Sequence, residues 1–254
     1  MRIARYSHEG RVRYGVVEGN EVLELPGHPF STAGEALTTT GVVHELDAVR
    51  LLAPVIPTKV IGIGKNYADH AAEMGGQAPE QPLMFLKPTT ALIGSDDPIV
   101  LPPESHEVHY EAELAVVIGR MCRRVPAAEA ASVILGYTCA NDVTARDLQR
   151  ADAQWTRAKG FDTFCPLGPW IDTDLDASDV VVECEVNGVT TQRASTADLI
   201  HGIPALIEAV SAVMTLLPGD VILTGTPAGV GPLVSGDEVA VTVAGLGTLV
   251  NPVR

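Results

Sequence analysis

The chain has 254 residues, of which 46% are hydrophobic and 19% are charged, and its formal net charge is −15. A chain of this length can bury a sizeable core in one large or two small domains, and this composition is typical of a globular protein rather than a disordered one. The acidic balance argues against nucleic acid as a partner, because phosphates require a basic surface. It leaves an anionic small-molecule substrate open, since a bound cation and a few lysines can reverse the field locally.

Residues 1–53 are predicted to form a small β-rich domain. Two strand-like runs flank Gly19-Asn20, a pair typical of hairpin turns. The proline-containing segment 51–57 is predicted to connect this domain to the next one. Residues 58–254 are predicted to form a second, larger domain.

A short helix is predicted over residues 66–74, and His70 and Glu73 share one of its faces because they are three apart. A carboxylate beside a histidine can fix the imidazole tautomer and raise its basicity, which makes a general base. Gly75-Gly76 ends the helix, and a polar loop follows, so the segment has the character of a mobile lid. On the pattern alone, an exposed helical pair without a role is the favoured interpretation.

The most informative segment is residues 110–119, which reads as a strand because it contains a β-branched apolar run and stops at Gly119. Residues two apart on a strand point to the same face, so Glu111 and Glu113 project side by side. Adjacent carboxylates repel each other and are costly to bury unpaired, so a divalent cation is expected between them. The alternative is the solvated polar face of an amphipathic strand.

Asp142 follows a second buried strand, predicted over residues 133–140, and belongs to a dense polar cluster. Active sites tend to be built where such a cluster follows a buried strand. Together with Glu111 and Glu113, Asp142 would supply three oxygen ligands and leave positions for water and substrate. This donor set suits Mg²⁺ or Mn²⁺ rather than Zn²⁺, since no cysteine or histidine has ligand-like spacing here.

Arg146 and Gln149 follow Asp142 by four and seven residues, so all three share a face if this segment is helical. Arg146 is expected to be a structural partner of Asp147 or Glu113. The role of Gln149 stays open on spacing alone.

Two lysines and one glycine-rich loop complete the candidate residues. From its sequence context alone, Lys159 is interpreted as an ordinary surface cation. Lys87 could neutralise buried carboxylates. The loop at residues 224–231 contains Gly225 and Thr226 but lacks the lysine and the helix of a phosphate-binding loop. It is interpreted as a tight loop that presents a hydroxyl and backbone N–H groups to a substrate carboxylate, with a plain connection between strands as the alternative.

The cysteine pattern and the apolar runs predict a cytoplasmic protein without a membrane segment. The four cysteines include no C-x-x-C pair and are expected to be reduced. Residues 1–6 lack the apolar region of a signal peptide. The apolar stretch at 203–217 contains Glu208 and is too short to span a bilayer, so it is predicted to be an amphipathic helix.

Strand-like runs dominate the larger domain, at 59–63, 91–93, 98–101, 113–118, 133–140, 180–186, 220–224 and 238–243. Helices are few, chiefly at 126–134 and 203–216. This mixture argues against a doubly wound parallel sheet, in which strands and helices would alternate. It predicts a β-rich α+β fold, either a β-roll or a distorted sandwich.

The sequence resembles the fumarylacetoacetate hydrolase (FAH) family from about residue 58 to its end. The matching segments occur in family order and are jointly specific: Ile61–His70, Phe85–Pro88, His109–Leu114, Asn141–Asp147, Lys159–Asp162 and Thr224–Gly231. The resemblance implies an FAH-type β-roll as the catalytic domain, with Mg²⁺ or Mn²⁺ held by Glu111, Glu113 and Asp142. It also implies a homodimer.

The resemblance further implies roles for residues that spacing leaves open. It makes His70 and Glu73 a catalytic dyad and Lys159 a catalytic residue that stabilises negative charge on substrate or intermediate. It places Gln149 in contact with substrate. Substrate binding is also expected from Thr226 and Gly225, and with a weaker case from Lys87.

Three hypotheses for the function follow from these residues and from what the resemblance implies. The first is a metal-dependent hydrolase or decarboxylase that cleaves a C–C bond of a small anionic 2-oxo acid, such as an acylpyruvate or oxaloacetate, through a metal-stabilised enolate. The second uses the same site to isomerise a hydroxymuconate-type dienedioate in aromatic catabolism. The third, a binding protein without turnover, is disfavoured by the intact carboxylate triad and the His–Glu pair.

Overall fold

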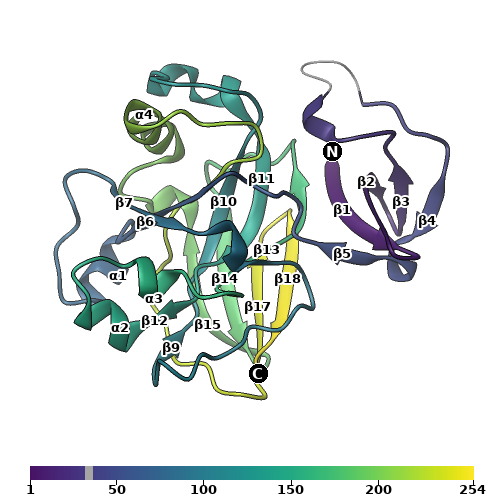
Figure 1. Cartoon of the computed structure of the whole chain (residues 1–254). Helices are drawn as coiled ribbons and strands as arrows, with labels where there is room; N and C mark the ends of the chain where they lie inside the picture. Colours follow the sequence, from purple (N-terminus) through teal and green to yellow (C-terminus); the bar gives the residue numbers. More distant parts are fainter. Residues whose placement is uncertain (32–36) are drawn as a thin grey trace.

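The structure is a computed structural model of the chain and describes residues 1–31 and 37–254. Ten strands follow one another across its largest sheet in the order β4-β3-β2-β1-β13-β11-β10-β16-β6-β7. Two further strands join this sheet outside that order, since β5 pairs with β1 and β8 pairs with β13. Neighbouring strands are antiparallel except for the parallel pairs β16–β6 and β13–β8. The N-terminal strands lie to one side of the molecule, yet β1 continues the sheet of the larger part through β13 (Figure 1).

The strands of the large sheet have the following bounds: β1 Arg2–His8, β2 Arg11–Glu18, β3 Glu21–Glu24, β4 Val43–Glu45, β5 Arg50–Leu52, β6 Val60–Gly64, β7 Leu83–Lys87, β8 Leu92–Ile93, β10 Ala112–Ile118, β11 Ile134–Asn141, β13 Cys165–Asp172 and β16 Val221–Leu223. A four-stranded sheet has the order β15-β14-β17-β18. Its strands are β14 Val181–Val186, β15 Val189–Ser195, β17 Glu238–Val243 and β18 Gly247–Pro252. The short strands β9 (Val108–His109) and β12 (Thr144–Ala145) pair with each other.

Strand β10 lies at the centre of the fold and is buried on both faces. Leu114 and Val116 belong to the core that also contains residues of the four-stranded sheet, whereas Ala115 and Val117 belong to the core on the opposite face. Because side chains alternate along a strand, Glu113 shares the face of Ala115 and Val117. The carboxylate therefore lies on the face of the large sheet that is turned away from the four-stranded sheet.

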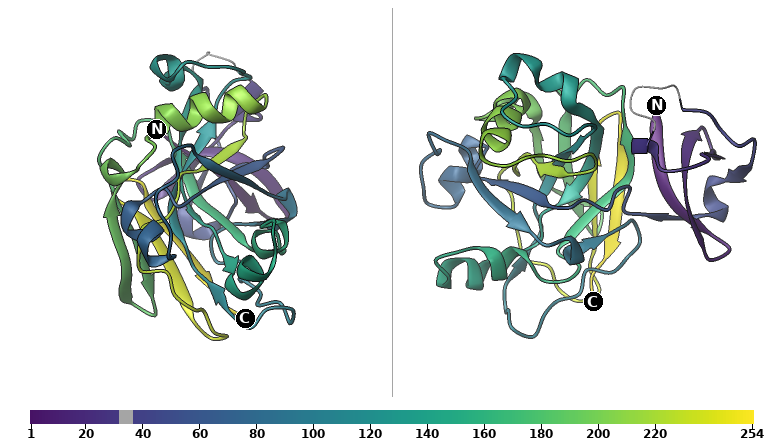
Figure 2. Two further views of the ribbon diagram at one scale, coloured as in Figure 1. Left: turned by 90° about the vertical axis from the view of Figure 1, so that its left-hand side faces the viewer. Right: turned by 45° about the horizontal axis from the view of Figure 1, so that its top comes forward.

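The helices are short and lie around the sheets. They are α1 Ala68–Glu73, α2 Arg146–Ala151, α3 Thr156–Lys159 and α4 Ile203–Val213, with 3₁₀ turns η1 Pro29–Ser31, η2 Leu46–Ala48, η3 Thr89–Ala91, η4 Ala127–Val133 and η5 Thr196–Asp198. Helix α4 and turn η4 pack together at one end of the sheets (Figure 2). None of the helices in the described ranges is long and apolar enough to cross a membrane.

The fold is the β-rich α+β class expected from the sequence, but several elements differ. The segment expected as a helix at 126–134 is a 3₁₀ turn, and the helix expected at 203–216 ends at Val213. The run at 98–101 forms only an isolated bridge between Ile99 and Val253. Strands β7, β13, β15 and β18 lie outside the expected runs.

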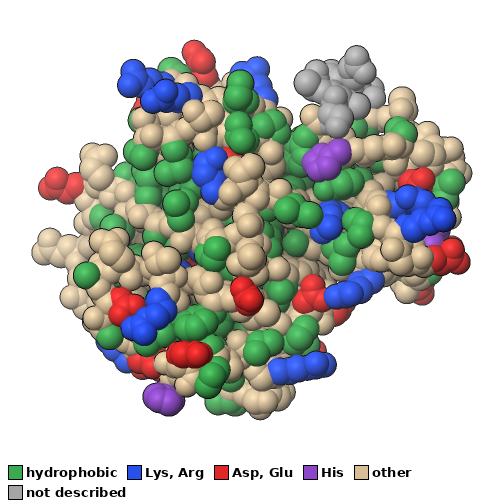
Figure 3. Space-filling model, in the orientation of Figure 1, with side chains coloured by type: hydrophobic (Ala, Val, Ile, Leu, Met, Phe, Trp, Pro, Cys, Tyr) green, Lys and Arg blue, Asp and Glu red, His purple; other side chains and the backbone are tan. Residues whose placement is uncertain are grey.

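Charged side chains of both signs lie on the face of the molecule shown in Figure 3. On this face, they are interspersed among hydrophobic and uncharged ones. The charges that bear on chemistry lie inside the molecule, at the ends of β10 and β11.

Candidate active site

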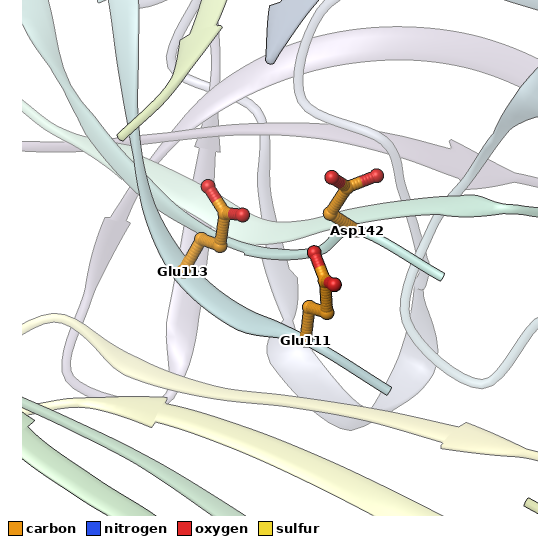
Figure 4. Close-up of side chains that lie close together, drawn as sticks. All are labelled: Glu111, Glu113 and Asp142. Atoms are coloured by element: carbon orange, nitrogen blue, oxygen red, sulfur yellow. The ribbon is translucent and has the colours of Figure 1, made fainter. Parts of the chain in front are cut away.

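Three buried carboxylates meet where β10 begins and β11 ends. Glu111 immediately precedes β10 and Asp142 immediately follows β11, and the backbone N–H of Asp142 donates to the carbonyl of Glu111 at 2.9 Å. Glu113 lies two residues further along the chain, within β10 and on the same face as Glu111. One carboxylate oxygen from each residue lies within 4.8 Å of the others, and the three residues are 1–4% exposed. Their side chains point toward one another in Figure 4.

Three buried cations surround two of these carboxylates. The ammonium of Lys159 donates to Glu111 at 2.8 Å and to Asp142 at 2.6 Å. Arg146 forms an ion pair with the other oxygen of Glu111, and Lys87 forms one with the other oxygen of Asp142. Burial opposes the charge of Lys159, but the negative charges of Asp142 and Glu111 hold the pKa of its ammonium above the usual value.

Glu113 differs from its neighbours because no described basic side chain contacts it. Its carboxylate accepts a hydrogen bond from the backbone N–H of Gly225 at 2.6 Å. Burial, together with the negative charges of Asp142 and Glu111, raises the pKa of Glu113 well above its usual value. Burial alone would also raise the pKa of Glu111, but Arg146 and Lys159 reverse that effect and hold it well below.

This arrangement fits a divalent metal ion. The donors are carboxylate oxygens, which Mg²⁺ and Mn²⁺ prefer. Glu113 is a buried carboxyl that forms no ion pair with a described side chain, and a cation between it, Glu111 and Asp142 would supply a direct positive partner.

The His70–Glu73 pair forms on helix α1 and reaches the same site. Nδ1 of His70 lies 3.0 Å from one oxygen of Glu73, and the other oxygen accepts the backbone N–H of Gly229 at 3.1 Å. With Glu73 ionised, Nδ1 carries the proton and Nε2 of His70 is left with its lone pair. Asn66 holds the start of this segment in place, because its amide donates to the carbonyls of His201 and Thr224 at 3.0 and 2.8 Å.

A cavity of about 160 Å³ joins the dyad to the carboxylates. We call the buried lining residues Glu111, Glu113 and Lys159 the floor, and the more exposed lining residues Lys65 and Arg150 the rim. The remaining lining residues are Ile63, Gly64, His70, Met74, Arg146, Gln149, Trp155 and Thr226.

The structure brings together most of the residues predicted from the sequence. Gln149 and Thr226 line the cavity, as do His70 and Lys159. Gln149 accepts a hydrogen bond from Arg146 at 2.8 Å. Their contacts with substrate remain predictions.

Two residues expected to contact substrate are engaged within the protein instead. Lys87 is not among the residues that line the cavity, since its ammonium is 0% exposed and is engaged by Asp142 and the carbonyl of Val143. It acts as a counter-ion to a candidate metal ligand. The N–H of Gly225 is likewise used by Glu113 and is not free for a substrate.

The partner expected for Arg146 needs correction. Arg146 pairs with Glu111 rather than with Asp147 or Glu113. Asp147 instead accepts hydrogen bonds from Ser105 and from the backbone of His106. Helix α2 begins at Arg146, and this position aims the guanidinium at the carboxylate cluster.

Sequence reasoning missed Lys65, Arg150 and Trp155 as residues of the site. Trp155 packs edge-on against Phe85, and Gly64 leaves room for it, since a Cβ there would lie 2.8 Å from its ring. The position of Lys65 directly after a buried strand was the one signal that could have identified it. Trp155 and Arg150 carry no comparable signal.

Comparisons with known families agree with this geometry. The family description "Fumarylacetoacetate (FAA) hydrolase C-terminal" matches residues 59–254, and "Rv2993c-like, N-terminal" matches residues 1–54. A curated relative, the mitochondrial oxaloacetate tautomerase FAHD2A of Bos taurus, is 43% identical over 92% of this chain and 78% of its own length.

Two solved structures extend the comparison. The 5-carboxymethyl-2-hydroxymuconate delta-isomerase of Mycobacterium smegmatis is 56% identical with a TM-score of 0.93, covering 100% of this chain and 99% of the other. The maleylpyruvate hydrolase of Sphingobium sp. SYK-6, solved with manganese(II) and pyruvate, is 34% identical with a TM-score of 0.81, covering 100% and 98%.

Proposed function

Because this chain belongs to the fumarylacetoacetate hydrolase family and is an enzyme of that family, we propose that it acts on short 2-oxo acids through their enolates and depends on a divalent metal ion. The observation that carries the proposal is one small cavity lined both by Glu111 and Glu113 of the buried carboxylate triad and by His70, which Glu73 holds. The expected outcome is proton transfer, as in a tautomerase or isomerase.

Glu111, Glu113 and Asp142 would hold the metal, either Mg²⁺ or Mn²⁺. When bound, such an ion supplies a Lewis acid that withdraws electron density from a chelating 2-oxo carboxylate. The manganese(II) in the maleylpyruvate hydrolase structure supports this assignment.

The chain's own residues would transfer the proton and stabilise the negative charge that develops. Nε2 of His70, with Glu73 holding the tautomer, removes a proton from the carbon next to the 2-oxo group. His70 then gives this proton to the substrate oxygen in tautomerisation, or to another carbon of the substrate in isomerisation. The fixed charge of Lys159 stabilises the negative charge that develops on the substrate oxygen. Gln149 and Thr226 would orient the substrate from the wall of the cavity.

The size of the cavity favours a compact acid. About 160 Å³ lies well below the roughly 300 Å³ at which pockets for drug-sized ligands begin. An acid of the size of oxaloacetate is therefore preferred to a longer dienedioate, and the similarity to an oxaloacetate tautomerase agrees with this choice.

Cleavage of a C–C bond is the second candidate. Its support is the likeness to a maleylpyruvate hydrolase whose structure contains pyruvate. In that case, His70 would activate a water molecule against the distal carbonyl of an acylpyruvate. Decarboxylation of oxaloacetate would need no water.

A substrate panel tests the proposal. Oxaloacetate, acetylpyruvate, fumarylpyruvate and a hydroxymuconate would each be followed by ultraviolet absorbance and proton NMR, with Mg²⁺ and with a chelator. We expect metal-dependent enol–keto interconversion of oxaloacetate to be the fastest reaction. Absence of turnover of all four acids in the presence of Mg²⁺ or Mn²⁺ would refute the proposal.

We also propose that the enzyme is cytoplasmic, as the cysteine pattern predicts, and that it is a homodimer formed by the larger part of the chain, as the family resemblance implies. Light scattering at micromolar concentration tests the dimer. A monomer mass would contradict it.

A further inference from the structure

Lys65 has an unusual backbone conformation at the rim of the cavity. It follows the last residue of β6 and precedes Asn66, and its φ is +56°, in the left-handed region that residues other than glycine rarely adopt. Such a conformation is strained and tends to persist at functional sites. The half-buried side chain lines the cavity beside Met74 of the α1 segment.

Lys65 differs from the other basic side chains that line the cavity. Arg146 and Lys159 are paired with the buried carboxylates, and Arg150 is paired with both oxygens of Glu107. In the described part of the chain, the ammonium of Lys65 makes neither a hydrogen bond nor an ion pair. It is therefore the cation of this cavity that is left without an anionic partner.

Gly76 leaves room for this ammonium. A Cβ on Gly76 would lie 2.8 Å from Nζ of Lys65, and its other near neighbour is the carbonyl of Ala71 at 3.8 Å. Gly76 does not have a positive φ, so its backbone conformation does not require glycine. The absent side chain instead provides the space in which the end of Lys65 lies.

We propose that Lys65 determines specificity by binding a carboxylate at the end of the substrate remote from the 2-oxo acid group. The substrates would then be short 2-oxo diacids rather than monoacids. The inference rests on the proposed function for the position of the 2-oxo acid at the floor. An ammonium held in a cavity is costly to leave unpaired, and a substrate carboxylate supplies the missing partner. The apolar walls formed by Ile63, Met74 and Trp155 suit the carbon atoms between the two ends.

Binding of two unreactive acids tests the proposal without turnover. Malate is lactate with one added carboxylate at the remote end, and both lack the 2-oxo group. Calorimetry on the Mn²⁺-loaded enzyme should give malate an affinity roughly 10–100-fold higher than that of lactate, the equivalent of a hydrogen bond to a charged group. Lys65→Met should remove most of this ratio, and Lys65→Arg should retain part of it.

Two further variants separate a direct contact from a general effect of charge. Arg150→Met removes a rim cation that already has a partner, and it should change the malate-to-lactate ratio by less than about 3-fold. Gly76→Ala keeps the ammonium but displaces it, so it should lower the ratio without the loss of a charge.

The outcomes separate this inference from the proposed function. Equal affinities for malate and lactate in the wild type, or an unchanged ratio in Lys65→Met, would overturn the role of Lys65 whatever the enzyme turns over. A malate preference that depends on Lys65 would support the diacid subsite even if the substrate panel failed.

Discussion

The floor and the rim of the cavity differ in whether their charged side chains have buried partners. At the floor, Glu111 is buried and paired with Arg146 and Lys159. At the rim, Lys65 lacks a partner within the described chain, and Arg150 forms a pair whose side chains are 60% and 36% exposed. The ion pairs of the floor hold its side chains in one arrangement, whereas the ammonium of Lys65 at the rim would gain its partner from a ligand.

The charge balance of the carboxylate cluster shows what a bound metal ion would add. Three carboxylates face three cations, Lys87, Arg146 and Lys159, so the cluster is neutral when all of them are ionised. A divalent ion would bring the formal charge of this cluster to +2, which would attract an anionic substrate to this end of the cavity. The difference between the ends suggests that the floor sets the chemistry and the rim selects the substrate.

The largest expected effect follows from removing a carboxylate from the floor. Glu111→Ala should abolish Mn²⁺ binding and activity together, because the ion loses one of its three carboxylate ligands and Arg146 and Lys159 lose their anion. Titration with Mn²⁺ by electron paramagnetic resonance measures this directly, and circular dichroism checks folding. The control is Glu107→Gln, which removes an exposed carboxylate near the rim and should leave Mn²⁺ affinity unchanged within about 2-fold. Wild-type Mn²⁺ affinity in Glu111→Ala would exclude Glu111 as a ligand.

Removing the base should separate catalysis from metal binding. His70→Ala should lower turnover by roughly 10²–10⁴, the usual contribution of a general base. Its Mn²⁺ affinity should stay nearly intact, because His70 contacts Glu73 rather than the triad. Steady-state kinetics at saturating Mn²⁺ is the measurement, and full activity would remove the dyad from the mechanism.

The raised pKa of Glu113 predicts that metal affinity depends on pH. In the metal-free protein, Glu113 keeps its proton at pH values at which an ordinary glutamate is ionised, because of burial and the charges of Asp142 and Glu111. Metal must displace that proton, so Mn²⁺ affinity should rise up to about 10-fold per pH unit below this pKa and level off above it. Calorimetry in buffers of different ionisation enthalpy counts the protons released. Affinity that falls as pH rises through this range would contradict the mechanism.

The smallest expected effect concerns residues 66–82, which carry the dyad over the cavity. Asn66 anchors the start of this segment through its hydrogen bonds to His201 and Thr224. Few polar contacts hold the rest of it, chiefly Glu73 to the N–H of Gly229 and His201 to the carbonyl of Pro79. We predict that its amide hydrogens exchange faster without ligand than with oxalate and Mg²⁺. Hydrogen exchange followed by mass spectrometry tests this. Equal, strong protection in both states would make the segment a fixed wall.

Alternation along strands was enough to predict the carboxylates of the floor. Glu111 and Glu113 were identified from their spacing, and Asp142 from its position after a buried strand. The direction in which the surrounding cations point could not be predicted, because it depends on tertiary packing. Spacing does not distinguish Lys87, which lies behind Asp142, from Lys65, which faces the cavity.

Secondary structure was missed where local signals opposed the tertiary structure. Two prolines within Cys165–Asp172 argue against a strand, yet β13 pairs with β1 and β11. The alanine-rich segment at 126–134 favours an α-helix. In the 3₁₀ turn that forms instead, residues three apart align, so Ala130 and Val133 are buried together where η4 packs against α4.

The pairing of β1 with β13 has a consequence for synthesis of the protein. Arg5, Tyr6 and Ser7 pair with β5 early in synthesis. Ile3 pairs with Ile171, so the start of this edge of the first strand, at Arg2 and Ile3, finds its partner only after about 170 further residues have been made. At roughly 5–20 residues per second, this edge waits for about 10–30 s on the ribosome. The hairpin of β1 and β2 can close at once, whereas the continuous sheet is completed late. An exposed strand edge can pair with another chain, so expression of truncated chains ending before residue 165 should favour aggregation.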